Sequence, residues 1–241
     1  MRLIACLCLA LVVSLTSGAV AQQEYASETR SWSFTAPEGW HLIPFDQVAD
    51  MNAAAQGAVG SSGFKYVAGF SRSPSGIGTP YILVQLQDNH FKGMSYENIQ
   101  RAANSELARE AEERVKRRMA GNFHFDPIRV EPSHARFVRT GTISTNGLSL
   151  ECATYGYLGA DKIVQFNCYS SAGQLGADQP KFDEMLATFR FAPDKQFTPG
   201  GGSEVDKAER LGYATGRIVA FALIGVVVAA IAGVIKKVRG G

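Results

Sequence analysis

The feature that most restricts the fold is an apolar run at the C-terminal end of the chain. Ile218–Ile235 is a stretch of 18 residues without a single charge. As an α-helix with a rise of ~1.5 Å per residue, it would be roughly 27 Å long, close to the hydrocarbon thickness of a bilayer. A buried core helix is the alternative, but a run that is apolar on every face and ends the chain favours a membrane span. The sequence therefore predicts one transmembrane helix over residues 217–237.

The two ends of the chain together predict its topology. Leu3–Val13 is a short apolar stretch after one basic residue, and Ala19-Val20-Ala21 matches the small-residue signature of signal peptidase cleavage. Residues 1–21 therefore read as a cleaved signal peptide, since they are short for a retained anchor. Lys236, Lys237 and Arg239 follow the apolar run, as is typical of a cytoplasmic flank. We expect a single-pass protein of the inner (plasma) membrane, with a periplasmic or extracellular domain and a cytoplasmic tail, residues 238–241.

Removal of the two ends changes the charge of what is left. The whole chain has a net charge of +2, but residues 22–216 hold 19 of its 24 basic residues and all 22 acidic ones. The exported part is therefore mildly acidic, with a net charge of −3. A nucleic-acid-binding domain would concentrate Lys and Arg in its folded part, so the sequence predicts no nucleic-acid partner.

Small residues recur at intervals of four within the predicted span. Gly225, Ala229 and Gly233 share one helix face, where small side chains let two helices approach closely. They predict packing with a protein partner or a homo-oligomer through the span, although Gly and Ala are also simply common in spans. Residues 194–216 are polar and Gly-rich, so we expect a flexible juxtamembrane linker between the membrane and the domain, residues 22–193.

Two of the four cysteines, Cys6 and Cys8, leave with the signal peptide. Cys152 and Cys168 lie in a predicted hairpin made of Leu148–Leu158, a Gly159–Asp161 loop and Lys162–Ser170. If Leu158 faces Lys162, the two cysteines stand opposite each other on one face, within bridging distance. Because the compartment is oxidising, we expect a structural disulfide. A redox-active pair is less favoured, because the C-x-x-C spacing is missing.

The pattern of apolar and turn residues predicts the other elements. Apolar residues at every fourth position over Ser95–Met119, including Leu107, indicate a long helix. The Asn146-Gly147 pair is a strong hairpin signal. The element order predicts an α+β domain, an α/β/α sandwich around a central antiparallel sheet. The expected strands are Ser31–Thr35, Trp40–Pro44, Phe64–Ser71, Tyr81–Gln87, Ala135–Ile143, Leu148–Leu158, Lys162–Ser170 and Phe189–Phe191, and the other expected helices are Phe45–Gln56 and Pro180–Thr188.

Residues with an obvious chemical role are scarce. The four histidines do not pair at metal-ligand spacing, and His124 with Asp126 would supply too few ligands. No nucleophile elbow, phosphate-binding loop or dinucleotide fingerprint is present. The sequence therefore predicts no cofactor, no metal site and no catalytic residues. A hydrolase stays open as an alternative, because a triad can assemble from distant residues.

Two short segments resemble a known superfamily. SWSFTAPEGWHLI, Ser31–Ile43, looks like the F-x-x-P-x-G-W opening of PsbP-like domains, and FDEMLATFRF, Phe182–Phe191, is similar to their last helix and strand. The resemblance implies an α/β/α sandwich and a role in binding or assembly, without a shared catalytic motif. It covers roughly residues 28–193 in element order.

These observations favour a membrane-anchored, non-catalytic binding or assembly module of the bacterial cell envelope. Loops on a rigid sheet often carry recognition, so Gly57–Gly63 and Ser73–Pro80 are candidate binding segments, although they can equally be plain connections. The first alternative is a membrane-anchored envelope hydrolase with a noncontiguous active site. The second is a sensor subunit, which the short tail disfavours unless the span pairs with a longer protein.

Overall fold

A computed structural model describes residues 23–59, 64–117, 121–145 and 147–200. The predicted signal peptide, the span over residues 217–237 and its small residues Gly225, Ala229 and Gly233 lie outside the described residues. Among those that are described, no helix is both long and apolar enough to cross a membrane.

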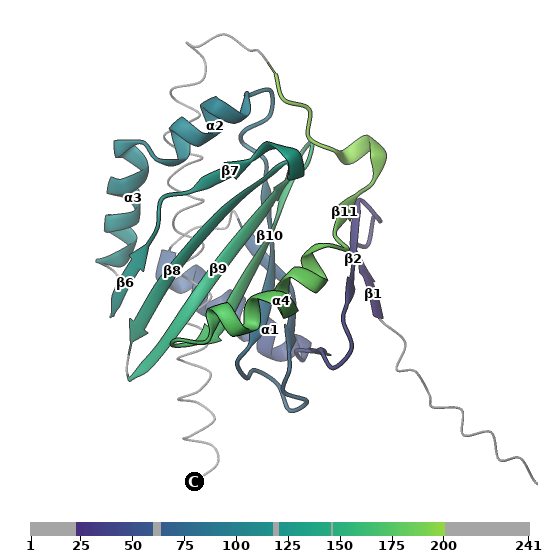
Figure 1. Cartoon of the computed structure of the whole chain (residues 1–241), viewed down its shortest axis with the longest axis vertical. Helices are drawn as coiled ribbons and strands as arrows, with labels where there is room; N and C mark the ends of the chain where they lie inside the picture. Colours follow the sequence, from purple (N-terminus) through teal and green to yellow (C-terminus); the bar gives the residue numbers. More distant parts are fainter. Residues whose placement is uncertain (1–22, 60–63, 118–120, 146, 201–241) are drawn as a thin grey trace, which may run out of the picture.

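The centre of the fold is one antiparallel sheet (Figure 1). Its strands follow the order β3-β4-β5-β10-β9-β8-β6, and β7 also pairs with β8. A smaller antiparallel sheet has the order β1-β2-β11. The large sheet consists of β3 (His41–Leu42), β4 (Phe64–Ser71), β5 (Tyr81–Asp88), β6 (Asn122–Phe125), β7 (Arg129–Glu131), β8 (Arg136–Thr145), β9 (Leu148–Leu158) and β10 (Lys162–Ser171), and the small one of β1 (Gln23–Ala26), β2 (Trp32–Ala36) and β11 (Arg190–Phe191).

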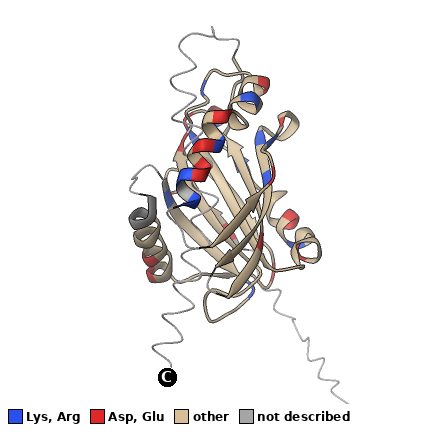
Figure 2. Cartoon of the chain, turned by 90° about the vertical axis from the view of Figure 1, so that its left-hand side faces the viewer, with Lys and Arg blue, Asp and Glu red and all other residues tan. Residues whose placement is uncertain are grey.

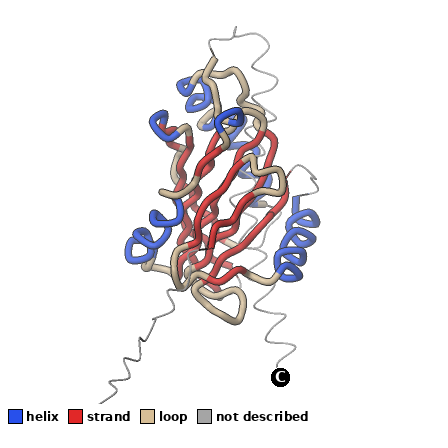
Figure 3. Tube along the Cα trace, turned by 90° about the vertical axis from the view of Figure 1, so that its right-hand side faces the viewer, coloured by secondary structure: helices blue, strands red, loops and turns tan. Residues whose placement is uncertain are grey.

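Helices cover both faces of the large sheet, which confirms a mixed α+β fold. In Figure 1, α4 (Leu175–Leu186) is drawn in front of the sheet and α1 (Phe45–Val59) behind it. Helices α2 (Tyr96–Ala103) and α3 (Glu106–Lys116) lie on the same side as α1. On β8, Ile143 packs in the hydrophobic cluster under α1 and Phe137 packs in the cluster under α2. Because these two residues are an even number of positions apart in one strand, their side chains point to the same face of the sheet. Figure 3 shows the strands between these two helical layers. Two short 3-10 helices, η1 (Pro132–His134) and η2 (Pro193–Lys195), complete the described elements.

The small sheet is held to the large one by aromatic side chains. Phe34 of β2 is fully buried and meets the rings of Phe70 and Phe166 edge-on, at centroid distances of 5.4 and 5.1 Å. Such geometries add to the hydrophobic gain from burial. The predicted strand at Ser31–Thr35 is thus confirmed, but it does not form a hairpin with the next strand. Strand β2 joins the small sheet, whereas β3 pairs with β4 at the edge of the large one.

The long helix predicted over Ser95–Met119 is wrong as one element. It divides at Asn104 and Ser105 into α2 and α3. The Asn104 side chain accepts a hydrogen bond from the Ile128 amide (2.9 Å) and donates one to the Ile128 carbonyl (2.8 Å), and the Ser105 hydroxyl accepts one from the Ala108 amide. This break shifts the helical phase, so Leu107 is 54% exposed while Ala108 is buried.

The predicted disulfide is also wrong, because the hairpin register differs by one residue. The Gly159 amide donates to the Lys162 carbonyl (2.8 Å), so the turn residues are Ala160 and Asp161 alone. Leu158 consequently faces Ile163 instead of Lys162. A shift by one residue turns every following side chain to the other face.

Cys152 therefore pairs with Tyr169, and Cys168 pairs with Ala153. Cys152 packs in the core under α1, whereas Cys168 packs in the core under α4. Both cysteines are free and buried. The sheet itself separates the two sulfur atoms, so no bond joins them.

The chain beyond β11 stays on the domain. Ala160 donates its amide hydrogen to the Lys195 carbonyl, Phe197 is buried beside α2, and the Gly200 amide donates to the Met94 carbonyl (3.3 Å). Residues 194–200, which the sequence analysis assigned to the linker, therefore pack against the folded part.

Candidate functional site

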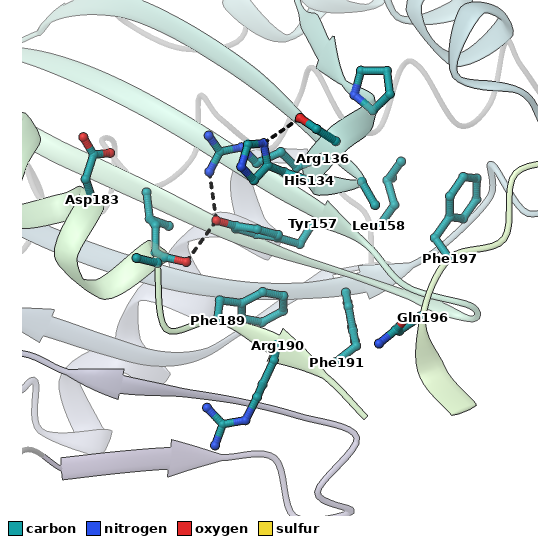
Figure 4. Close-up of a pocket in the computed structure, with 15 residues that line it drawn as sticks. His134, Arg136, Tyr157, Leu158, Asp183, Phe189, Arg190, Phe191, Gln196 and Phe197 are labelled. Carbon is teal, nitrogen blue, oxygen red and sulfur yellow. Dashed lines mark hydrogen bonds between the residues drawn. The ribbon is translucent and has the colours of Figure 1, made fainter. Parts of the chain in front are cut away.

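A pocket of about 780 Å³ lies on the α4 side of the molecule, where the two sheets come together (Figure 4). Four segments that are distant in the sequence line it. They are η1 with the start of β8, the end of β9, the end of α4 with β11, and the segment after η2. The lining residues are Pro132, Ser133, His134, Ala135, Arg136, Tyr157, Leu158, Asp183, Leu186, Ala187, Phe189, Arg190, Phe191, Gln196 and Phe197.

Arg136 is the best-fixed charge in this pocket. It is the first residue of β8 and stands opposite Tyr157 of β9. Its Nε donates to Glu131 Oε2 (2.7 Å), and its Nη1 donates to the Tyr157 hydroxyl (2.9 Å). The guanidinium also lies over the rings of Tyr155 and Tyr157, 5.1 and 5.6 Å from their centroids. These contacts hold the guanidinium plane in one orientation.

The charges around Arg136 leave an excess of positive charge. Glu131 Oε1 also accepts a bond from Arg129 Nη2 (2.8 Å), so one carboxylate serves two guanidinium groups. Burial lowers the pKa of Arg136, but the bonds to Glu131 and Tyr157 outweigh this effect and raise the pKa above its usual value. Burial raises the pKa of the Tyr157 hydroxyl, although Arg136 opposes the increase. At neutral pH the pocket therefore presents a cation and a neutral phenol.

Aromatic rings form the opposite wall. Phe189 lies 4.4 Å from Tyr157 between ring centroids and 5.1 Å from Phe191. The Tyr157 hydroxyl in turn donates to the Leu186 carbonyl (3.2 Å), which ties the wall to the end of α4. In Figure 4, Arg136 and Tyr157 lie together, while Arg190 points away from them. The lining thus carries two arginines, Arg136 and Arg190, and one carboxylate, Asp183, beside an apolar wall, which suits a ligand group that is partly apolar and partly anionic.

A serine and a histidine also lie in the pocket. Ser133 Oγ is 3.0 Å from His134 Nδ1, and Glu131 Oε2 is 3.9 Å from the same nitrogen. A catalytic triad needs the serine and the carboxylate on different ring nitrogens, so that a proton can pass between them. Here both groups approach Nδ1, and Ser133 and His134 are exposed. Ser133, His134 and Glu131 are therefore not arranged as a catalytic triad.

No motif in the sequence points to the residues of this pocket. None of the loop Ser73–Pro80 lines it, and of the four histidines only His134 does. In the described parts of the chain, no group of three or more His, Cys, Asp and Glu side chains could hold a metal ion. One sequence feature could have placed Arg136 beside Tyr157. The Asn146-Gly147 turn predicts the register of the β8–β9 hairpin, and in that register Arg136 stands opposite Tyr157.

Two of the solved structures that this chain resembles in shape come from a cyanobacterium and a mycobacterium. No protein-family model matches the chain, and no curated protein matches it. The solution structure of cyanobacterial PsbP (CyanoP) from Synechocystis sp. PCC 6803 is 10% identical, has a TM-score of 0.46 and covers 75% of this chain and 99% of that chain. The crystal structure of LpqN, involved in cell envelope biogenesis of Mycobacterium tuberculosis, is 11% identical, with a TM-score of 0.39 over 73% of this chain and 88% of that one. Because both TM-scores are below 0.5, no role is transferred from either protein.

Proposed function

We propose that the chain is a membrane-anchored, non-catalytic binding or assembly module of the bacterial cell envelope, and that it holds a protein partner in the pocket around Arg136. The predicted signal peptide and span support the location. The pocket supports the activity. Its partner would present an acidic side chain or a chain terminus next to an apolar one.

One observation carries this proposal. Arg136 is fixed by Glu131 and Tyr157 against an aromatic wall that includes Phe189. Arginine and tyrosine are the residues that contribute most often to the binding energy of protein interfaces, especially in a pocket that excludes water. Because the guanidinium is already oriented, Arg136 would lose little additional side-chain entropy when a partner binds.

Photo-crosslinking in intact cells tests this proposal. A photoreactive residue replaces His134, whose side chain is 59% exposed at the pocket. The matched control carries the same residue at Glu110, an exposed position of α3. We expect the His134 position to give one discrete adduct in the membrane fraction, and Arg136→Met to reduce it about tenfold, as the loss of one charged contact implies. Equal adducts from both positions, or an adduct that Arg136→Met leaves unchanged, would refute the proposal.

The hydrolase alternative has one observation of its own, the contact between Ser133 and His134. A reactive serine would be labelled by a fluorophosphonate probe, and Ser133→Ala would abolish the label. We expect no labelling at Ser133, because His134 Nδ1 cannot serve both Ser133 and Glu131 in a relay. Labelling of Ser133 that depends on His134 would refute the binding module and support the hydrolase.

Anchoring and association through the span are part of the same proposal. Protease added to intact spheroplasts should remove the domain but spare the span, which a cytoplasmic domain would not allow. Replacement of Gly225 and Gly233 by Leu should weaken self-association or partner association in membranes, because larger side chains keep helices apart. Unchanged association would refute the proposed packing through Gly225, Ala229 and Gly233. It would leave the proposal for the pocket around Arg136 untouched.

A further inference from the structure

We propose that this protein has a second binding site, a groove beside α3 that takes a small organic oxyanion, a carboxylate or a phosphate monoester, on Arg139. The groove has a volume of about 370 Å³ and lies between α2–α3 and the strands β6 and β8. It is lined by Ala103, Asn104, Ala108, Arg109, Glu112, Glu113, Lys116, Phe125, Pro127, Ile128 and Arg139. It shares no lining residue with the pocket around Arg136.

The break between α2 and α3 builds one wall of the groove. Asn104 leaves the helical path and holds both backbone groups of Ile128. Gln100 Oε1 accepts a further hydrogen bond from the Val130 amide (2.7 Å). The segment before β7 is therefore fixed opposite α3, with small side chains, Ala103 and Ala108, facing the gap.

Arg139 lines the inner side of the groove, where it is only 7% exposed. Its Nε donates to the Asp126 carbonyl (2.8 Å), and its Nη2 donates to Glu112 Oε2 (2.6 Å). Its Nη1 is buried and has no hydrogen-bond partner.

An unpaired charged donor in a buried place is costly. A buried polar group without a partner costs roughly 1–3 kcal/mol, and a charged one costs more. An oxyanion that enters between the side chains covering Nη1 removes this cost, because its oxygen atoms accept from Nη1 while Nε and Nη2 keep their present bonds. Arginine is suited to this role, since its planar group presents several donors at fixed angles.

The charges of the groove favour an anion. Glu112 is bound by Lys116 (2.8 Å) as well as by Arg139, and Lys116 also reaches Glu113 (3.0 Å). With Arg109, three cations and two carboxylates line the groove, so one positive charge is in excess. Figure 2 shows how closely acidic and basic residues follow one another along this part of the chain.

The shape of the groove restricts the ligand to a small one with an apolar part. Phe125 forms its floor, with Arg139 at 4.7 Å and Lys116 at 6.0 Å from the ring centroid. Phe125 is held there by Gly141, where a Cβ atom would collide with the ring. A volume of this size is near the lower end of the range for small-molecule sites. The ligand therefore has one oxyanion on Arg139 and a compact apolar group between Phe125 and Ala108.

Calorimetric titration of the full-length protein in non-ionic micelles tests the site. The probes are phenyl phosphate and benzoate, and uncharged benzyl alcohol is the control. We expect saturable binding of at least one oxyanion with a Kd of about 1 mM or tighter, and none of the alcohol. The two oxyanion arms distinguish a phosphate ester from a carboxylate. Labelling with 15N-arginine should show a shift of the Arg139 Nε–H signal on titration.

Three variants separate the site from the general stability of the fold. Arg139→Lys should weaken binding about tenfold, because it keeps the charge but loses the fork of donors. Arg101→Lys, an exposed position of α2 that lines neither pocket, should leave the Kd unchanged. Ala108→Leu fills the groove without touching Arg139, and should abolish binding even if Arg139→Lys does not fold. The proposal is overturned if the native protein binds neither oxyanion, if the Arg139 Nε–H signal still shifts in Ala108→Leu, or if Arg101→Lys is as defective as Arg139→Lys.

Discussion

Strand β8 carries two arginines three residues apart, and they face opposite sides of the sheet. Arg136 faces the α4 side and Arg139 faces α3. Each lies over an aromatic ring, and each binds a glutamate that a second cation shares. The same combination of groups thus occurs twice, once on each face.

Burial makes the two arrangements different. The Arg136 side chain is 18% exposed and its partner Glu131 19% exposed, whereas the values for Arg139 and Glu112 are 7% and 8%. A charge that keeps some water can exchange one partner for another at little cost, but a fully desolvated charge depends on the partners it has. We infer that the Arg136 site is shaped for exchange with a partner, and that the Arg139 site also holds the fold together.

The largest difference should come from removal of the two glutamates. Glu112→Ala leaves Arg139 buried without its carboxylate, so the free energy of unfolding should fall by about 3 kcal/mol or more. Glu131→Ala should cost about 1 kcal/mol or less, since water reaches this pair. Denaturant unfolding followed by the fluorescence of the buried Trp32 and Trp40 measures both values. Equal losses would show that the two sites do not differ in the way their burial indicates.

The next largest effect should come from Asn104→Ala, which acts on the groove alone. This change removes the acceptor of the Ile128 amide and the donor to the Ile128 carbonyl, at a cost of about 2 kcal/mol. Hydrogen exchange of the Ile128 amide should accelerate. Asn98→Ala, six residues earlier and within α2, is the control and should have little effect on that amide. If Ile128 stays protected in Asn104→Ala, the groove wall does not depend on this side chain.

Most strands and the fold class could be predicted, because alternation of apolar residues and turn signals are local. Phe64–Ser71 and Leu148–Leu158 begin and end in the structure where the sequence placed them. The prediction of a single helix over Ser95–Met119 was wrong, because Asn104 leaves the helix to bind the backbone of Ile128, which is 24 residues away. Its only local signal is the Asn104-Ser105 pair, two residues that favour helix ends.

The candidate sites were harder to predict than the fold. The Cys152–Cys168 pairing failed because a two-residue turn and a three-residue loop differ by one step of register, which periodicity does not reveal. The pocket around Arg136 needs the end of α4 and β11 to lie beside β9, and this contact depends on the packing of the small sheet. Sequence patterns predict such a contact poorly, since it joins segments far apart in the chain, such as Tyr157 and Leu186, which are 29 residues apart.

A smaller effect is expected from Arg136→Met, which keeps much of the packing on Tyr155 and Tyr157 but loses the charge. The free energy of unfolding should fall by about 1 kcal/mol, because the ion pair with Glu131 is partly hydrated. The adduct formed from the His134 position should nevertheless fall about tenfold. Arg129→Met is the control, since it removes the other cation on Glu131 but lies outside the pocket. A large loss of stability in Arg136→Met but not in Arg129→Met would show that Arg136 serves mainly to stabilise the fold.

The smallest effect is that of a reductant, which should not change the stability of the protein at all. Cys152 and Cys168 lie on opposite faces of the sheet, so there is no bond to reduce. Burial raises the pKa of the Cys152 thiol to about 12, so alkylation of the native protein at pH 8 should be negligible, while denaturation should expose both thiols. The sign of the pH dependence follows from the same shift. Above pH ~8.5 the unfolded chain releases a proton that the folded chain retains, so the stability should fall as the pH rises. A mass increase of two protons on reduction would contradict the register of β9 and β10.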